Sequence, residues 1–354
     1  MDWPRSIRSS CERWPIICII NKHIDIAKKV NLLHTSHQYV VGIDLGGTKI
    51  AAALFDPAGA IISREQMETS GARTAKEVVQ RMVSMIRTVS AGYPLAGVGL
   101  ASPGAVDSRE GIALNGTNLP EWNHVPLKKW MEKDLGVEVK VVNDANAAAW
   151  GEYVHGAGKG AENMVYITFS TGVGAGIVLD GKLLLGSRSF AGELGHTVID
   201  PGGALCSCGN RGCWETFASG TAIRDSALSL MKERESLIRT LAEEQGEAVS
   251  AKHVFEAQKQ GDAVAIDVIR RAVHYMGLGL ANVIHTFNPD RIVIGGGVSR
   301  AGDQLFPALR AETERFVMAP YRQSYTLVPA GLNDDVGLIG AAALFHTNPP
   351  SSAD

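Results

Sequence analysis

The segment Tyr39-Val-Val-Gly-Ile-Asp-Leu-Gly-Gly-Thr-Lys-Ile-Ala-Ala-Ala-Leu-Phe55 carries the pattern that decides the fold. An apolar run, Tyr39 to Leu45, leads into the tight turn Gly46-Gly47-Thr48. A second apolar run, Ile50 to Phe55, ends at Asp56-Pro57-Ala58-Gly59. Two apolar strands joined by a glycine-containing turn are typical of a β-hairpin. The segment therefore predicts a hairpin that places Asp44 near the end of a buried strand.

The same layout returns later in the chain, which indicates an internal duplication. An apolar run, Met164 to Phe169, is followed by the turn Ser170-Thr171-Gly172-Val173-Gly174, by a second apolar run, Ala175 to Leu179, and by Asp180-Gly181. Two copies of one strand–turn–strand unit favour two similar domains that face each other across a cleft. Helical and strand patterns alternate through the remaining sequence, so the predicted fold class is α/β.

Several elements outside the two hairpins are predicted from periodicity. Helical patterns cover 75–91 and 263–287, and the charged stretch 221–260 is also expected to be helical. A strand over 139–143 meets a helix at Asp144, a further strand begins at Arg291, and an apolar helix is expected over 337–345.

The composition argues against several classes of protein. The chain has 354 residues, of which 45% are hydrophobic, and a formal net charge of −3. The sequence contains no basic block, which argues against a nucleic-acid partner and against an anionic membrane surface. Five cysteines are too few for a disulfide scaffold, so we expect a reducing, cytoplasmic environment.

Residues 1–38 precede the first predicted strand and are expected to form a disordered extension. Their apolar run, Trp14 to Ile20, is too short to cross a bilayer. Asp2 and Glu12, together with the lack of a small-residue cleavage site, argue against a secretory signal.

A histidine and three cysteines lie close together in the sequence and form a candidate metal site. They occur in Gly192-Glu193-Leu194-Gly195-His196 and in Cys206-x-Cys208-Gly209-x-x-Gly212-Cys213-x-Glu215. One imidazole and three thiolates, from His196, Cys206, Cys208 and Cys213, complete a tetrahedral zinc site with no open position, which indicates a structural Zn²⁺. The alternative is three reduced cysteines in a glycine-rich loop. Neither Glu193 nor Glu215 is needed as a ligand.

The two hairpin turns are candidate phosphate sites. Glycines let a phosphate approach backbone N–H groups, and an acidic side chain beside them suits Mg²⁺. The spacing excludes a Walker-type loop and does not fit a dinucleotide-binding motif. An ordinary hairpin turn is the alternative for the first copy, but the second copy favours a polyphosphate held from both ends. The candidate ATP-binding residues are Asp44, Gly46, Gly47, Thr48, Lys49, Thr171, Gly172, Val173 and Gly174, with Gly296 and Gly297 suited to the base and ribose.

Asp144 is the candidate catalytic residue. It stands where a strand meets a helix, beside Asn143. One interpretation is a helix N-cap, and the other is a general base that takes a proton from a hydroxyl group. Phosphoryl transfer needs little more from a protein than positioning and charge neutralisation.

A third group of residues fits a sugar site, because convergent carboxylates, amides and imidazoles can bind hydroxyl groups. Glu193, His196 and Glu215 form this group, and the amide of Asn118, near Trp122, is a further candidate. A plain turn residue before Pro120 is the alternative for Asn118.

Taken together, these motifs resemble the ROK family of repressors and sugar kinases, within the actin-like ATPase fold. The similarity covers about residues 39–346. The matching pieces are Asp44-Leu-Gly-Gly-Thr-Lys, Ser102-Pro-Gly-Ala-Val-Asp107, Asn118-Leu-Pro, Asn143-Asp-Ala-Asn, Ser170-Thr-Gly-Val-Gly-Ala-Gly176 and the stretch from Gly192 to Glu215. One departure is Ala175, where many members have glycine.

The resemblance implies two ribonuclease-H-like domains flanking a cleft: 39–148 with 338–348, and 149–337. It implies ATP-dependent phosphorylation of a hexose at the 6-hydroxyl, with glucose favoured and Asp144 as base. The sugar would be held by Asn118, Asn143, Asp144, Glu193, His196 and Glu215, and a homodimer is expected. The alternatives are an N-acetylmannosamine or N-acetylglucosamine kinase and, less favoured, a sugar-responsive repressor.

Overall fold

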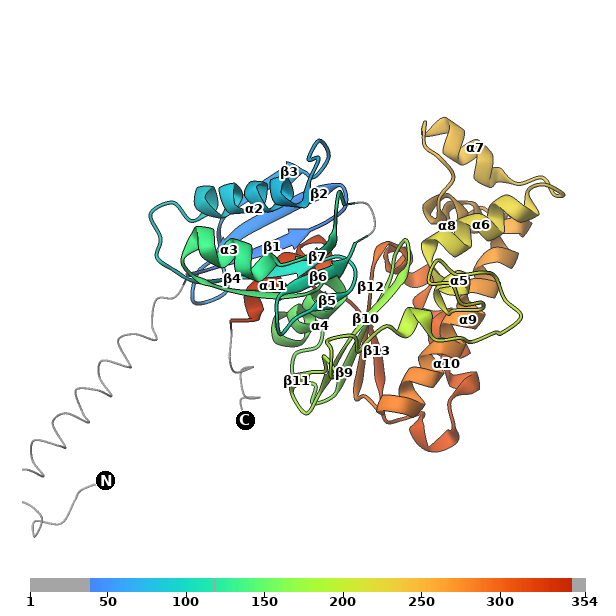
Figure 1. Cartoon of the computed structure of the whole chain (residues 1–354). Helices are drawn as coiled ribbons and strands as arrows, with labels where there is room; N and C mark the ends of the chain where they lie inside the picture. Colours follow the sequence, from blue (N-terminus) through green and yellow to red (C-terminus); the bar gives the residue numbers. More distant parts are fainter. Residues whose placement is uncertain (1–38, 117–118, 346–354) are drawn as a thin grey trace, which may run out of the picture.

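Two five-stranded sheets with the same strand topology form the centre of the molecule (Figure 1). The computed structural model describes residues 39–116 and 119–345. The first sheet has the order β3 (Ile61–Glu68), β2 (Lys49–Phe55), β1 (Tyr39–Leu45), β4 (Leu95–Ser102) and β8 (Glu138–Asn143). The predicted hairpin is confirmed, because β1 and β2 pair antiparallel with Asp44 opposite Ala51. The pairs β1–β4 and β4–β8 are parallel.

The second sheet repeats this arrangement. Its order is β11 (Lys182–Leu183), β10 (Val173–Leu179), β9 (Met164–Phe169), β12 (Arg291–Gly295) and β13 (Thr326–Pro329). The antiparallel hairpin β9–β10 is followed by the parallel pairs β9–β12 and β12–β13. The duplicated layout seen in the sequence therefore corresponds to a duplicated sheet.

The first lobe, which we define as the first sheet with its covering elements, has α2 (Ala75–Val89) and α3 (Leu127–Leu135) beside that sheet (Figure 1). Thr74 caps α2 by accepting the N–H of Glu77, and Val78, Met82 and Ile86 form its buried apolar stripe. A small sheet completes the lobe: β5 (Val106–Asp107), β6 (Ile112–Asn115) and β7 (Asn123–Val125).

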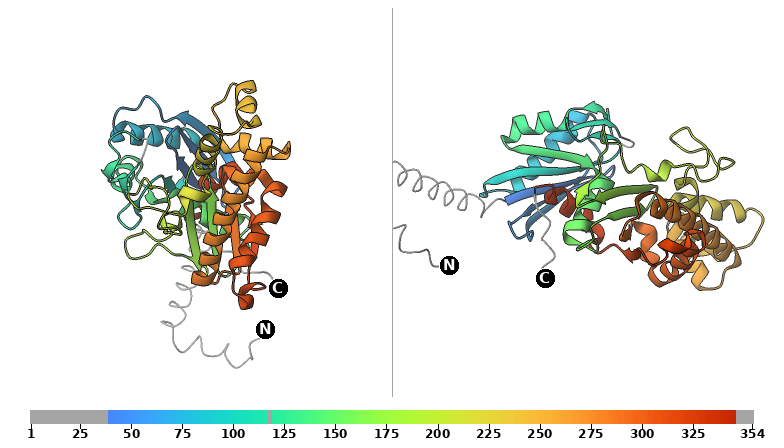
Figure 2. Two further views of the ribbon diagram at one scale, coloured as in Figure 1. Left: turned by 90° about the vertical axis from the view of Figure 1, so that its right-hand side faces the viewer. Right: turned by 90° about the horizontal axis from the view of Figure 1, so that it is seen from below.

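The second lobe, the second sheet with its helices, lies on the right of Figure 1 and is seen from two further sides in Figure 2. Its long helix α9 (Ala263–Phe287) has the predicted bounds. The stretch predicted as helical over 221–260 divides into three helices. The helices of this lobe are α5 (Glu215–Ala218), α6 (Gly220–Leu230), α7 (Leu237–Glu244), α8 (Ala251–Lys259), α9 and α10 (Phe306–Phe316), with short 3₁₀ turns η2 (Leu194–His196), η3 (Gly297–Gln304) and η4 (Ala319–Tyr321). The largest cluster of buried apolar residues lies in this lobe, and a separate large cluster lies in the first lobe.

Two helices cross between the lobes. The first, α4 (Asp144–His155), follows the last strand of the first sheet but packs on β9 and β10 of the second. The second, α11 (Val336–Ala343), follows η5 (Asn333–Asp335) after the last strand of the second sheet and packs on β1 and β4 of the first. Gly99 of β4 allows this close approach, because a Cβ there would clash with the carbonyl of Ala341. Each helix therefore ties its lobe to the other.

Some predictions lie outside the described residues. They include the extension 1–38, Asn118, and residues 346–348 of the predicted first domain. The predicted domain limits stay a prediction. Within the described ranges, no helix is both long and apolar enough to cross a membrane.

Candidate functional site

A cavity of about 920 Å³ opens where β1, α4, β9, β10 and α11 meet. It brings together residues from both hairpins, from the start of α4 and from the metal-site region. Ten residues singled out from the sequence line it: Asp44, Asn143, Asp144, Thr171, Gly172, Val173, Gly174, Glu193, His196 and Glu215. Motifs far apart in the chain therefore converge on one volume.

The other predicted residues lie elsewhere. Gly46, Gly47 and Thr48 form the turn after β1, and Lys49 begins β2. None of the four lines the 920 Å³ cavity, although the charge of Lys49 acts on Asp44. Gly297 lines an adjoining cavity of about 560 Å³ that also contacts Thr171. Gly296 precedes η3 with a φ of 85° and lines neither cavity.

The side chain of Asp144 faces the cavity from the first turn of α4. Asn143 caps this helix, because its Oδ1 accepts the N–H groups of Ala145 and Asn146, and its Nδ2 donates to the carbonyl of Gly104 at 3.0 Å. Asp144 Oδ1 accepts the N–H of Ala145 at 2.8 Å, and the side chain of Asn143 also hydrogen-bonds to this carboxylate. The N-cap interpretation of Asp144 therefore gives way to Asn143 as the cap.

The surroundings of two aspartates in the cavity raise their pKa values. Burial raises the pKa of Asp144 above its ordinary 3.8; the N–H of Ala145 opposes this, and the negative charge of Glu193 adds to it. Burial also raises the pKa of Asp44 to about 6; Asp144 adds to this and Lys49 opposes it. A carboxylate with a raised pKa in a cleft is typical of a group that accepts protons or binds a cation.

Glu215 connects the second hairpin turn to the metal-site region. Its Oε2 accepts the N–H of Val173 at 3.2 Å, and its Oε1 accepts from the thiol of Cys206 at 3.4 Å. Both oxygens of Glu215 therefore already contact the protein. Glu193, in contrast, is exposed to the cavity and makes no side-chain cap bond with η2.

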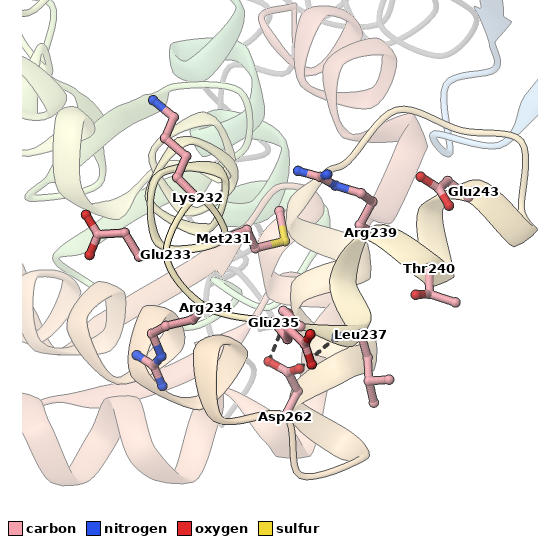
Figure 3. A pocket seen from close by; sticks show the side chains of 11 residues that line it. Met231, Lys232, Glu233, Arg234, Glu235, Leu237, Arg239, Thr240, Glu243 and Asp262 are labelled. Atoms are coloured by element: carbon pink, nitrogen blue, oxygen red, sulfur yellow. Dashed lines mark hydrogen bonds between the residues drawn. The ribbon is translucent and has the colours of Figure 1, made fainter.

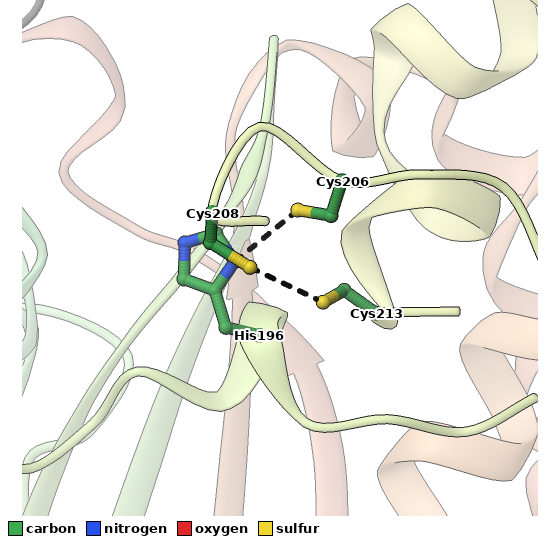
Figure 4. A group of neighbouring side chains, drawn as sticks. All are labelled: His196, Cys206, Cys208 and Cys213. Carbon is green, nitrogen blue, oxygen red and sulfur yellow. Dashed lines mark hydrogen bonds between the residues drawn. The ribbon is translucent and has the colours of Figure 1, made fainter. Parts of the chain in front are cut away.

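His196, Cys206, Cys208 and Cys213 form a compact group (Figure 4). Their donor atoms all lie within 4.8 Å of one another. The Nδ1 of His196 is 3.5 Å from the sulfur of Cys206, and the sulfurs of Cys208 and Cys213 are 3.5 Å apart. A tetrahedron with metal–sulfur bonds of about 2.3 Å has edges of about 3.8 Å, so the group has the size and donor chemistry of a zinc site.

Other side chains in the cavity were not identified from the sequence. Tyr166 and Thr168 reach it from β9, and burial raises the pKa of Tyr166. Both occur in an apolar strand, where no alternation distinguishes them. Val336 and Gly337 bring the start of α11 to the cavity, and a Cβ on Gly337 would lie 2.5 Å from the carboxylate of Asp44. No local pattern indicates that approach.

Another cavity, of about 760 Å³, lies between 231–236 and α7 (Figure 3). None of the predicted residues lines it. The side chains of Lys232, Glu233 and Arg239 point in different directions there and do not converge on one place. We therefore place the site in the 920 Å³ cavity.

Duplicated sheets around a carboxylate-lined cleft define a protein of the two-domain actin-like ATPase fold. The chain belongs to the ROK family, whose model matches residues 40–348.

Individual relatives include sugar kinases of two kinds. The chain is 39% identical to the glucokinase of Thermotoga maritima over 306 residues, 86% of this chain and 96% of that protein. It is 36% identical to the N-acetylmannosamine kinase of Salmonella arizonae over 310 residues, 86% and 97% of the two chains. The crystal structure of a ROK family glucokinase from Streptomyces griseus, in complex with glucose and AMPPNP, is 37% identical, covers 88% of this chain and 100% of its own, and gives a TM-score of 0.75.

Proposed function

We propose that this protein transfers the γ-phosphoryl group of ATP to the 6-hydroxyl of glucose, with Asp144 as the general base. One observation carries the proposal: a single cavity joins a base with a raised pKa, a carboxylate-rich group suited to hydroxyls, and a glycine turn suited to phosphates. The similarity to glucokinases over most of both chains supports glucose as the substrate.

The sugar would bind between Asp144, Glu193, His196 and Glu215. The Nδ1 of His196 faces the sulfur of Cys206, so its other ring nitrogen is the one available to a hydroxyl. Carboxylates accept hydrogen bonds from sugar hydroxyls, and the side chain of Asn143 lines the same cavity. The role of Asn118 stays a prediction from the resemblance.

The nucleotide would run from this cavity into the adjoining one of about 560 Å³. Thr171 lines both cavities, and Gly297 lines the second. That second cavity is rich in cations, namely Arg224, Lys252, Lys259 and Arg300, against the carboxylate of Glu256. Backbone N–H groups of 171–174 and of the turn at 46–49 would contact phosphates.

The chain's own residues would mainly accept the proton of the hydroxyl group and hold the reactants in place. Asp144 would accept the hydroxyl proton as the sugar oxygen attacks the γ-phosphorus and the bond to the ADP oxygen breaks. Asp44 lines the cavity under the influence of the charge of Lys49 and suits a divalent cation; Mg²⁺ would supply neutralisation of phosphate charge when it is bound with ATP.

A structural zinc ion in the Cys₃His group is part of the proposal. Burial raises the pKa of the Cys213 thiol to about 12, whereas the N–H of Asn210 lowers the pKa of Cys208 to about 7. A buried thiol of this kind ionises readily only beside a cation, which fits a metal. The three described cysteines are unpaired, which agrees with the proposed reducing cytoplasm; a homodimer is proposed from the family resemblance alone.

The test is a coupled ADP-release assay with Mg-ATP on glucose, mannose, fructose, N-acetylglucosamine and N-acetylmannosamine. We expect turnover with glucose as the preferred sugar. Preference for an N-acetylated sugar would replace the substrate and keep the mechanism. No turnover on any of them would overturn the proposal and favour a sugar-responsive repressor.

A variant tests the assignment of the base. Asp144→Asn should lower kcat by about 10²- to 10⁴-fold. Glucose should still raise the melting temperature of the variant, because the sugar contacts of Glu193 and His196 remain. Near-normal kcat would remove Asp144 from the role of base.

A further inference from the structure

We propose that Asn146 binds one hydroxyl group of the hexose and so is an additional specificity residue of the site. The inference rests on the proposed sugar phosphorylation. It starts from a small extension of the cleft, about 60 Å³ in volume, behind the start of α4. The extension shares Ala105, Asn143, Asp144, Gly174 and Glu193 with the main cavity, so the two adjoin.

Asn146 has a polar atom in this region with no use in the fold. The residue is 2% exposed, and its Oδ1 is buried without a hydrogen-bond partner among the described residues. The oxygen is not needed to cap α4, because Asn143 already accepts the N–H groups of Ala145 and Asn146. A buried acceptor left unpaired destabilises a protein by about 1–3 kcal/mol, so a ligand that donates a hydrogen bond there would be favoured.

The walls of the extension select the kind of donor. Its polar side chains are those of Asn143, Asp144, Asn146, Ser189 and Glu193. No lysine, arginine or histidine lines it, and two of the five polar side chains are carboxylates. An anion such as phosphate is therefore disfavoured, and a neutral group with O–H donors is favoured.

Backbone geometry keeps the extension small. Gly192, with a φ of 97°, lies where a Cβ would sit 2.8 Å from the carbonyl of Ala175 and 3.8 Å from Oδ1 of Asn146. The N–H of Ser108 donates to Oγ of Ser189 at 3.1 Å, which joins the two lobes at the same place. A volume of about 60 Å³ suits one hydroxyl-bearing carbon of a sugar.

The experiment is a thermodynamic cycle in which one change is made in the enzyme and the other in the sugar. Wild type and Asn146→Ala are assayed with glucose and with 1-, 2-, 3- and 4-deoxyglucose, and kcat/KM is measured for each. The wild type should lose about 2- to 10-fold on the deoxy sugar that lacks the bound hydroxyl. Asn146→Ala should show the same loss on glucose itself and no further loss on that one deoxy sugar, with KM for ATP unchanged.

Controls separate binding from folding. Val154→Ala lies on the same helix in a different buried cluster and should lower stability without changing discrimination among the sugars. Asn146→Ala should not lower the melting temperature as Val154→Ala does, because it removes an unpaired oxygen. If Asn146→Ala does not fold, Asn146→Leu keeps the volume while removing the acceptor, and the same cycle applies.

The outcomes are distinct. If the Asn146 variant loses as much kcat/KM as the wild type does on each of the four deoxy sugars, relative to glucose, the inference is overturned. The proposed function would still stand in that case, because the wild type turns over glucose. Absence of hexose turnover and of a glucose-induced thermal shift in the wild type would instead overturn the proposed function, and the inference with it.

Discussion

Glu152 is expected to hold together the two connections between the lobes. It lies near the end of α4 and is fully buried. Its carboxylate accepts the N–H of Ala157 at 2.7 Å, just after α4, and the N–H groups of Gly331 at 3.1 Å and Leu332 at 2.8 Å, just before α11. One side chain thus bonds to both crossing segments of the backbone.

The substitution Glu152→Gln keeps the shape and changes the hydrogen bonds. Oε2 accepts two of the N–H groups and Oε1 accepts one, so the best amide orientation keeps the pair at Ala157 and Gly331 and points NH₂ at Leu332. The loss of one charge-assisted bond, with an unpaired N–H left behind, costs about 3–5 kcal/mol. Relief of carboxylate desolvation offsets part of this, which leaves about 3 kcal/mol.

Thermal unfolding measures the effect. For a folded region of this size, a loss of about 3 kcal/mol lowers the melting temperature by about 5 °C. Glu162→Gln is the matched control, because Glu162 is an exposed carboxylate after the same helix and should change stability by less than about 0.5 kcal/mol. A Glu152→Gln melting temperature within 1 °C of wild type would refute the reasoning that this carboxylate joins the crossings.

Three further predictions concern charge and metal. Because Asp144 acts as a base only when ionised and its pKa is raised, kcat/KM should fall on acidification at a pH above 3.8, and Glu193→Gln should move that fall to lower pH; an unmoved profile would contradict the coupling. Asp44 has a pKa of about 6 in the folded protein against 3.8, so its contribution to stability is present below pH 3.8 and lost as the pH rises through 6. Asp44→Asn should therefore be more stable than wild type at pH 8, by up to about 3 kcal/mol, with a correspondingly higher melting temperature, and should gain little at pH 4. An equal difference between variant and wild type at both pH values would rule this out. Purified protein should contain one zinc per chain by elemental analysis. Cys208→Ser should lose the zinc and melt several degrees lower, whereas the neighbouring Ser207→Ala should retain it. Full metal content in Cys208→Ser would count against the site.

Local sequence patterns predicted the elements whose apolar pattern is visible within a single segment. The hairpin β9–β10 and the helix α9 could be predicted because apolar runs and a 3.6-residue period are visible within each segment. The strand β3 was missed, because Ile61–Glu68 is an edge strand rich in charged and polar residues. Its pairing with β2 depends on tertiary context and not on its own composition.

The candidate site was predictable where motifs carry their own chemistry. His196 with Cys206, Cys208 and Cys213 is visible as a ligand set in the sequence, and the structure brings the four donors together. Tyr166 and the start of α11 were not predictable, because their positions follow from packing between segments more than 150 residues apart. The roles assigned to the site residues stay predictions until the variants are measured.

The crossing of α4 and α11 has a consequence for biosynthesis. The face of β1 and β4 that receives α11 is completed only after about 240 further residues have been translated, from Ser102 to Ala343. At 5–20 residues per second this takes about 12–50 s, during which side chains on that face, such as Val40 and Phe55, lack the packing that α11 provides. Gly42 and Gly99, where a Cβ would clash with α11, keep that nascent surface bare until the helix arrives. The first lobe can therefore reach its native packing only near the end of synthesis.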